Sequence, residues 1–357
     1  MTFAATPALQ AVVDHALAHE TDWPCSMYHP DGAYVGNREW NESGPWTEIV
    51  GPVKPRGGPA GVILHRGQRV ADWGDTTRTD MTFSIAKSYL SVLAGLAVKD
   101  GLITDLDAPV GDSVPGPHFA GEHNGRITWR HMLQMNSEWR GEIFGKDDQV
   151  DHYRQIGPGA DNSRKGQLRK VGPPGSHYEY NDVRVNALAY ALLMRFGRPL
   201  PEVLRERIMD PIGASDDWRW EGYSTSWIEM AGRRVQSVTG GGHWGGGLFI
   251  GADDHARFGQ FICQNGQWNG TQILPKGWMP QALTPTPTLD KYGFLWWLNR
   301  GAEADPKLPE TAFSAQGAGG HTIWIAPKHD IVAVMRWLAP TATPHFLRQL
   351  FAALADH

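Results

Sequence analysis

Ser84 and Lys87 are the residues whose types and spacing most directly suggest chemistry, because the lysine stands three positions after the serine. On a helix this spacing places both side chains on one face, one turn apart and within hydrogen-bond reach. A serine hydroxyl becomes a good nucleophile when an adjacent base accepts its proton, and a desolvated lysine can be that base. The same spacing also arises by chance on ordinary helices, so the pair is a hypothesis that needs support elsewhere in the chain.

Tyr180-Asn181-Asp182 is a second candidate, placed just before a helical pattern that starts near Val183. A tyrosine at a helix start can act as a phenolate base or pass a proton to a leaving group. The alternative is an ordinary buried aromatic residue followed by a helix N-cap at Asn181 or Asp182. The sequence leaves both interpretations open.

Two glycine-rich segments are the remaining candidates. Small residues occupy all but one of positions 315–320, which read Ala-Gln-Gly-Ala-Gly-Gly immediately before a predicted strand. They would let the backbone approach a ligand and direct an N–H group at a carbonyl oxygen, as an oxyanion hole requires, and a glycine-rich turn is the alternative. The cluster at 240–247 contains His243 and Trp244, which could contact a substrate or be buried in the core.

Hydrophobic spacing indicates the elements that must position these residues. Helices are predicted at residues 7–17, 82–100, 128–135, 183–196, 252–264 and 344–355. Short strands are predicted on both sides of the turn 65–68, and at 320–326 and 331–337. From about 110 to 235 the sequence contains no strand-like run.

This order of elements predicts two lobes. Residues 1–110 and 236–357 would together form a sheet lobe with flanking helices, and residues 111–235 would form an inserted, mostly helical lobe. Active sites commonly lie between such lobes, so we expect the site at the junction.

Together the three motifs resemble the serine β-lactamase and penicillin-binding protein superfamily, specifically the class C β-lactamase-like serine hydrolases, which include esterases, amidases and acyltransferases. The resemblance extends over nearly the whole chain and implies a two-lobed α+β/α/β fold, in which an antiparallel sheet is flanked by helices and carries an inserted helical lobe. The five segments that carry it are FSIAKSYLSVLAGLAVKDGLITDLDAPV (83–110), ITWRHMLQMNSEW (127–139), HYEYNDVRVNALAYALL (177–193), GGGLFIGADDHARFGQFICQNGQWNGTQILP (245–275) and KYGFLWW (291–297).

The resemblance also implies roles for the site residues. Ser84 would attack the acyl carbon, while Lys87 and Tyr180 would share the proton transfers, with the identity of the acylation base left open. The backbone N–H groups of Ser84 and Ala318 would bind the oxyanion. Water entering the cleft would then release the acyl group.

Three positions depart from the family's pattern. Asp182 stands where asparagine is usual, and an ionised carboxylate cannot donate a hydrogen bond. Ala315-Gln316-Gly317 replaces a lysine–threonine–glycine motif, which removes a cation that would meet the carboxylate of a β-lactam. Glu138 stands where glycine is frequent. The second departure argues against penicillin-type substrates, although Asp182, Ala315, Gln316 and Gly317 remain candidates for substrate contact.

Composition limits the other function classes. The 357 residues carry a net charge of −5 with a pI near 6.3, so nothing draws the chain to nucleic acid or to an anionic membrane. Cys25 and Cys263 are too few for a disulfide framework, and we expect reduced thiols. His15 and His19 have no third ligand in pattern, so neither a metal nor another cofactor is expected. No basic leader precedes an apolar run and no run is long enough for a membrane span, which predicts a cytoplasmic protein.

These observations favour a serine hydrolase that cleaves an amide or ester bond of a small molecule through an acyl-Ser84 intermediate. One alternative is β-lactamase, penicillin-binding or acyltransferase activity, and another is a non-catalytic binding module of the same fold. The acyl group, the leaving group and the oligomeric state stay open.

Overall fold

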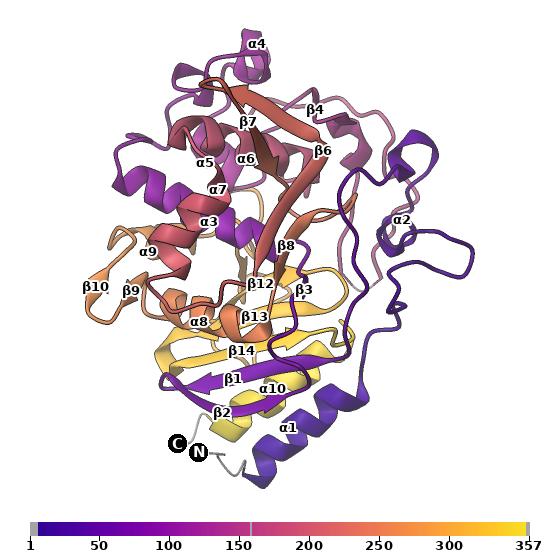
Figure 1. Cartoon of the computed structure of the whole chain (residues 1–357), viewed down its shortest axis with the longest axis vertical. Helices are drawn as coiled ribbons and strands as arrows, with labels where there is room; N and C mark the ends of the chain where they lie inside the picture. The colour runs from indigo at the N-terminus through magenta and orange to yellow at the C-terminus, as the bar shows by residue number, and fades with distance from the viewer. Residues whose placement is uncertain (1–5, 158, 355–357) are drawn as a thin grey trace.

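The computed structural model describes residues 6–157 and 159–354 and contains two larger sheets with helices around them (Figure 1). The helices are α1 (Pro7–Ala18), α2 (Val35–Glu39), α3 (Ile85–Lys99), α4 (Gly121–Asn124), α5 (Trp129–Leu133), α6 (Asp182–Phe196), α7 (Leu200–Leu204), α8 (Ala252–Cys263), α9 (Trp278–Ala282) and α10 (Thr343–Leu354). The strands are β1 (Ala60–His65), β2 (Gln68–Trp73), β3 (Asp80–Met81), β4 (Glu142–Ile143), β5 (Lys146–Asp147), β6 (Arg219–Met230), β7 (Arg233–Val238), β8 (Gly247–Ile250), β9 (Gln267–Trp268), β10 (Thr271–Gln272), β11 (Trp297–Leu298), β12 (Phe313–Gly317), β13 (His321–Ala326) and β14 (Ile331–Arg336).

The six-stranded sheet is antiparallel and is built from both ends of the chain. Its strands lie in the order β11-β12-β13-β14-β1-β2, so that β1 pairs with β14. Alternate residues of β14 face opposite sides, with Val332 and Val334 in the main core and Ala333 and Met335 in a second core beneath α1 and α10. Figure 1 shows α1 and α10 side by side on one face of this sheet, while α8 covers the other.

Helix α3 connects this sheet to the helical part of the molecule. Every residue from Ile85 to Ala97 is buried, and the helix packs against both α6 and β12. A helix that is apolar around its whole circumference belongs in the interior. Its first turn therefore opens at the boundary between the sheet and the helices, which is where the candidate serine lies.

A four-stranded sheet shows that the prediction of no strands between 110 and 235 was wrong. Its order is β3-β8-β6-β7, and β6 alone has 12 residues. The register of β6 against β7 shifts between Gly222 and Trp227, and a bulge of this kind interrupts the alternation by which a strand is recognised. The boundary that we placed at 235/236 falls within β7, and the division into lobes remains a prediction.

The other expected elements are confirmed with small shifts at their ends. Thr6 caps α1 by accepting a hydrogen bond from the Leu9 N–H, and β13 and β14 are joined by the turn Pro327–His329. Residue 355, the last of the final predicted helix, lies outside the described residues.

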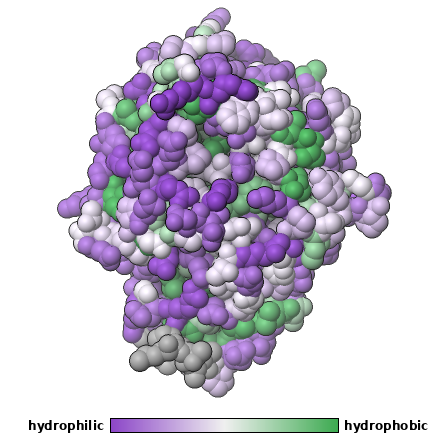
Figure 2. Space-filling view, in the orientation of Figure 1, coloured by the Kyte–Doolittle hydropathy of each residue, from purple (hydrophilic) through white to green (hydrophobic). Residues whose placement is uncertain are grey.

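The surface and the thiols add little to the placement of a site. The face in Figure 2 is largely hydrophilic, with hydrophobic side chains in small groups. Cys25 is exposed, Cys263 is buried, and both are free thiols. Within the parts of the chain that the structure describes, no helix combines the length and the apolarity needed to cross a membrane.

Candidate active site

Ser84 and Lys87 meet at the start of α3. Ser84 is the N-cap residue, with helical backbone angles and a half-buried position. Lys87 is 1% exposed, and its Nζ donates a 2.7 Å hydrogen bond to Ser84 Oγ. The free N–H groups of the first helical turn favour negative charge near the serine. The structure therefore brings the two residues together as the spacing predicts.

The turn before Ser84 explains why its hydroxyl is presented at the helix start. Phe83 has a φ of 51°, which is unusual for a bulky residue and costs free energy. The Phe83 side chain is fully buried and its ring packs against Trp23, His321 and Trp337. This packing holds the tight turn that ends the segment after β3 and starts α3 at the serine.

The end of β12 lies against the Ser84 amide. A Cβ atom on Gly317 would be 2.2 Å from the Thr82 carbonyl oxygen and 3.3 Å from the Ser84 nitrogen, so only glycine allows this approach. Ala318 follows at a half-buried position, before two glycines with positive φ. Ser84 and the Ala318 segment are thus neighbours, as the proposed oxyanion hole requires.

Tyr180 lies beside Lys87 on the other side. Its ring centroid is 4.8 Å from Lys87 Nζ, and the ring stacks on Trp297 with centroids 5.9 Å apart. Tyr180 is buried, with 5% of its surface exposed. Trp297 is half-buried, which leaves it as the tryptophan best placed to line a cleft at Tyr180.

Asp182 makes polar contacts with Lys87 and with two further buried side chains. Its Oδ1 accepts from Lys87 Nζ at 2.5 Å, and its Oδ2 is 2.6 Å from Arg154 Nη1 and 2.8 Å from His243 Nδ1. Its own N–H donates to Asp151 at 2.7 Å. Burial by itself would raise the pKa of Asp182, but the cationic Lys87 and Arg154 outweigh it and hold that pKa well below its usual range.

Further charged groups extend this arrangement, which we call the Asp182 cluster. His243 Nε2 is 2.5 Å from Glu42 Oε1, and the Lys165 ammonium contacts both Glu42 and Asp151. Glu42, Asp151 and His243 offer ligand atoms within 4.8 Å of one another, as a metal site would. Because Lys165 already lies against both carboxylates, a side chain supplies the cation there. The members of the cluster are Glu42, Lys87, Asp151, Arg154, Lys165, Asp182 and His243.

The glycine cluster at 240–247 packs directly against Lys87. Gly240 accepts a 3.1 Å hydrogen bond from Lys87 Nζ. A Cβ atom on Gly241 would be 2.8 Å from Lys87 Nζ and 3.4 Å from Ser84 Oγ. Trp244 is fully buried and stacks on His243 with centroids 3.9 Å apart, so it supports the histidine from behind.

The residues of β12 predicted to contact substrate have different surroundings. Ala315 is buried within the strand, whereas Gln316 is exposed and its Nε2 donates to Ser314 Oγ. Gly317 is half-buried at the end of the strand. Of these positions, Gln316 and Gly317 are the ones that a bound molecule could reach.

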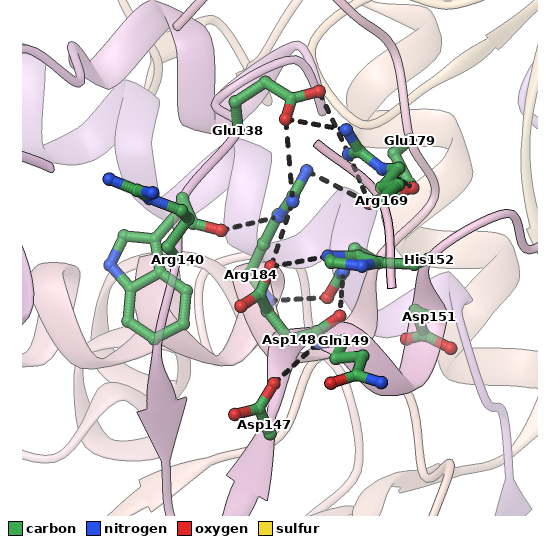
Figure 3. A network of polar contacts seen from close by, with 12 residues as sticks. Glu138, Arg140, Asp147, Asp148, Gln149, Asp151, His152, Arg169, Glu179 and Arg184 are labelled. Atoms are coloured by element: carbon green, nitrogen blue, oxygen red, sulfur yellow. Dashed lines mark hydrogen bonds and ion pairs between the residues drawn. The ribbon is translucent and has the colours of Figure 1, made fainter. Parts of the chain in front are cut away.

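A second group of buried charges, which we call the Glu138 cluster, includes Glu179, the residue before Tyr180 in the sequence (Figure 3). Glu138 has a φ of 51°, the conformation that glycine adopts most easily, and its carboxylate is fully buried. Arg169 pairs with both Glu138 and Glu179 at 2.7–3.0 Å. The members are Glu138, Asp148, His152, Arg169, Glu179 and Arg184.

Sequence reasoning missed most of the Asp182 cluster. Glu42, Arg154 and Lys165 lie in turns or irregular segments, and Asp151 ends the short helical turn Asp148–Asp151. Charged residues in such segments usually face solvent, and no spacing marks these four. Gly241 belongs to the glycine cluster at 240–247, which the sequence analysis identified as a candidate segment. The run of glycines is the sequence feature that points to it.

Comparison with known proteins gives the same family as the motifs. The family model for β-lactamase matches residues 55–350. An uncharacterized protein of Alkalihalophilus pseudofirmus is 24% identical over 271 residues, which is 70% of this chain and 71% of that protein. A penicillin-binding protein homologue from Caulobacter crescentus has a TM-score of 0.62 at 15% identity, covering 99% of both chains. A Bacillus anthracis protein provisionally described as a 6-aminohexanoate-dimer hydrolase has a TM-score of 0.56 at 20% identity, covering 95% of this chain and 87% of that one.

At these identities the two solved structures show a shared fold, an antiparallel sheet with flanking helices. The family model covers most of the chain, including Ser84, Tyr180 and the end of β12. The chain therefore belongs to the β-lactamase family.

Proposed function

We propose that this protein is a serine hydrolase that cleaves an amide or ester bond of a small molecule through an acyl-enzyme on Ser84. The observation that carries the proposal is the 2.7 Å hydrogen bond between a buried Lys87 Nζ and Ser84 Oγ. Family membership supports hydrolase chemistry in general, and the 6-aminohexanoate-dimer hydrolase description of the Bacillus anthracis structure suggests amides as one substrate class.

The site residues would act in sequence. Ser84 Oγ attacks the acyl carbon as Lys87 accepts the hydroxyl proton, and the oxyanion faces the N–H groups of Ser84 and Ala318. Tyr180 then passes a proton to the leaving nitrogen or oxygen, whose bond to carbon breaks. Water then attacks the acyl-Ser84 ester and gives a proton to the Tyr180 phenolate. The bond between the acyl carbon and Ser84 Oγ breaks, Lys87 returns its proton to Ser84 Oγ, and the carboxylic acid is released.

The end of β12 argues against a carboxylate-bearing substrate such as a penicillin. Ala315 stands where the family's motif has lysine, and its buried methyl group cannot pair with a carboxylate. β-Lactam hydrolysis and acyl transfer to an acceptor other than water are the alternatives within this chemistry, and a non-catalytic binding module is the alternative outside it.

Intact-protein mass spectrometry tests the proposal. Wild type and Ser84→Ala are mixed briefly with p-nitrophenyl butyrate and, separately, with a penicillin. The expected result is a butyryl adduct on wild type alone, with p-nitrophenol released. A long-lived penicilloyl adduct would favour the penicillin-binding alternative. Equal labelling of Ser84→Ala, or no adduct from either reagent, would contradict the mechanism.

Two neighbouring tyrosines provide a matched pair for the proton transfer. Tyr180→Phe should lower kcat by about 10²-fold without unfolding the protein, because only the phenolic hydroxyl is lost. Tyr178 also contacts Tyr292, and burial holds its pKa well above the usual value, so its hydroxyl stays neutral. Tyr178→Phe should therefore leave kcat nearly unchanged.

A further inference from the structure

The position of Asp182 raises a problem for the proposed mechanism. A base must be able to lose its proton, yet the Asp182 carboxylate lies 2.5 Å from Lys87 Nζ. An ionised carboxylate at this distance stabilises an ammonium group and so opposes the loss of its proton. The family's usual asparagine would present a neutral oxygen at the same place. Something else must offset the charge of Asp182 if Lys87 is to act as a base.

Two buried donors share the other oxygen of Asp182. Arg154 Nη1 lies 2.6 Å and His243 Nδ1 lies 2.8 Å from Oδ2. The Arg154 side chain is 2% exposed and that of His243 is 0% exposed, so neither interaction is screened by water. The negative charge of Asp182 is therefore divided among three donors.

Glu42 determines what His243 can contribute. The two ring nitrogens of His243 face carboxylate oxygens, Asp182 at 2.8 Å and Glu42 at 2.5 Å. A neutral imidazole carries one N–H, so His243 can donate to both only in its doubly protonated form. Glu42 thus favours a cationic histidine beside Asp182.

The charge balance of the whole cluster indicates which group would release a proton when His243 is cationic. Three carboxylates, Glu42, Asp151 and Asp182, are matched by Lys87, Arg154 and Lys165. A cationic His243 adds a fourth positive charge to a buried region. Excess positive charge in a desolvated site favours release of a proton, and the group in contact with Ser84 is Lys87.

We propose that Arg154, His243 and Glu42 are positioning residues that neutralise the Asp182 carboxylate, so that Asp182 presents to Lys87 the equivalent of a neutral amide oxygen. None of the three touches Ser84 in the structure; they act through Asp182. The inference rests on the proposed function, because it concerns the ability of Lys87 to accept the proton of Ser84.

The surroundings of Lys87 and His243 define what else could alter the measurement. Lys87 is also faced by Tyr180 and by the Gly240 carbonyl, and His243 by Asp151 at 3.9 Å and by the rings of Trp40 and Trp244. Lys146 lies over the Trp244 ring, and Glu39 interacts electrostatically with Arg154. The test therefore uses substitutions that change His243, Glu42 or Asp182 and leave these groups in place.

The experiment measures the rate of Ser84 acylation by p-nitrophenyl butyrate as a function of pH. His243→Gln keeps the side-chain size but removes the positive charge, so the acid limb of the profile should move up by about one pH unit. Glu42→Gln should move it in the same direction. Asp182→Asn combined with His243→Gln should return the limb toward the wild-type position, because the carboxylate that needed neutralising is gone.

A matched control separates this role from simple support of the fold. His152 is also a buried histidine paired with an aspartate, Asp148 at 3.1 Å, but it belongs to the Glu138 cluster. His152→Gln should change the melting temperature without moving the acid limb. An unchanged limb in both His243→Gln and Glu42→Gln, or a shifted limb that Asp182→Asn does not restore, would overturn the inference.

The test also separates the inference from the proposed function. If wild type is acylated at Ser84 but the variants show no shift of the acid limb, the proposed hydrolase function stands. The role of the three positioning residues is then rejected. Wild type that is not acylated, or a Ser84→Ala variant that is, would reject both. If His243→Gln does not fold, as judged by circular dichroism, Glu42→Gln alone and with Asp182→Asn carries the same comparison.

Discussion

The Asp182 cluster and the Glu138 cluster are built from the same materials but differ in what they touch. Both are buried and combine carboxylates with arginine and a histidine. They meet at the short helical turn Asp148–Asp151, where Asp148 belongs to the Glu138 cluster and Asp151 to the Asp182 cluster. Through Lys87, only the Asp182 cluster reaches the hydroxyl of Ser84.

The Glu138 cluster instead holds backbone segments in place, next to Tyr180 and at the start of α6. Arg169 binds Glu138 and Glu179 together, and Glu179 immediately precedes Tyr180. Arg184, in the first turns of α6, donates to the Trp139 carbonyl and to Asp148. Buried charge alone therefore does not distinguish the two clusters, whereas contact with the Ser84 hydroxyl does.

Among the substitutions that test this contrast, the largest effect is expected for the one at Lys87. Lys87→Met should lower kcat by about a thousandfold, because the proposed proton acceptor for Ser84 is lost. Lys99, at the other end of α3, donates to the Gln272 and Ile273 carbonyls, and Lys99→Met serves as the control. Steady-state kinetics with p-nitrophenyl butyrate, alongside circular dichroism, measures both. A Lys87→Met variant with near-normal kcat would remove the distinction between the clusters.

Arg169→Met should break the Glu138 cluster. It leaves two buried carboxylates without their shared partner, which should reduce the free energy of unfolding by about 3–5 kcal/mol. Arg198 pairs with Glu206 at the surface and is 40% exposed, so Arg198→Met should cost less than about 1 kcal/mol. Urea unfolding monitored by fluorescence compares the two. Equal stability of the two variants would mean that the Glu138 cluster is not a structural support.

Gly241→Ala tests how closely the glycine cluster at 240–247 packs against the Asp182 cluster. The new methyl group would lie 2.8 Å from Lys87 Nζ and 3.1 Å from Asp182 Oδ1, so it must displace groups that are held by several hydrogen bonds. A loss in kcat/KM of about tenfold or more is expected. Gly277→Ala, where a Cβ meets nothing within 4 Å, is the control. No difference between the two variants would contradict the packing described here.

The smallest expected effect is the pH dependence of stability. Burial would raise the pKa of Asp148, but the contacts with His152 and Arg184 lower it overall. A carboxylate with a lowered pKa in the folded state contributes stability above its unfolded pKa of about 4, and this contribution is lost as the pH falls through the folded value. Asp148→Asn should be less stable than wild type at pH 7, on the order of 1 kcal/mol, with the difference shrinking below pH 4. A stability difference between wild type and Asp148→Asn that grows as the pH falls would contradict this prediction.

Local patterns were sufficient for some parts of the fold and the site. The pairing of Ser84 with Lys87 depends on one turn of one helix, so its geometry follows from spacing. The β13–β14 hairpin follows from runs of apolar residues that are continuous in sequence, and α10 follows from apolar residues at helical spacing. Strand β6 was missed because its register shift interrupts the alternation on which recognition depends.

The sequence by itself determined that a serine and a lysine share one helix face, that a tyrosine precedes another helix, and that glycine-rich segments lie elsewhere in the chain. Only the tertiary structure decided what surrounds Asp182. Its partners come from separate segments, with Lys87 on α3, Arg154 in a loop and His243 in the glycine cluster, while Glu42 reaches His243 from near the N-terminus. A buried charge takes its partners from whichever segments fold against it, and no local spacing encodes that choice.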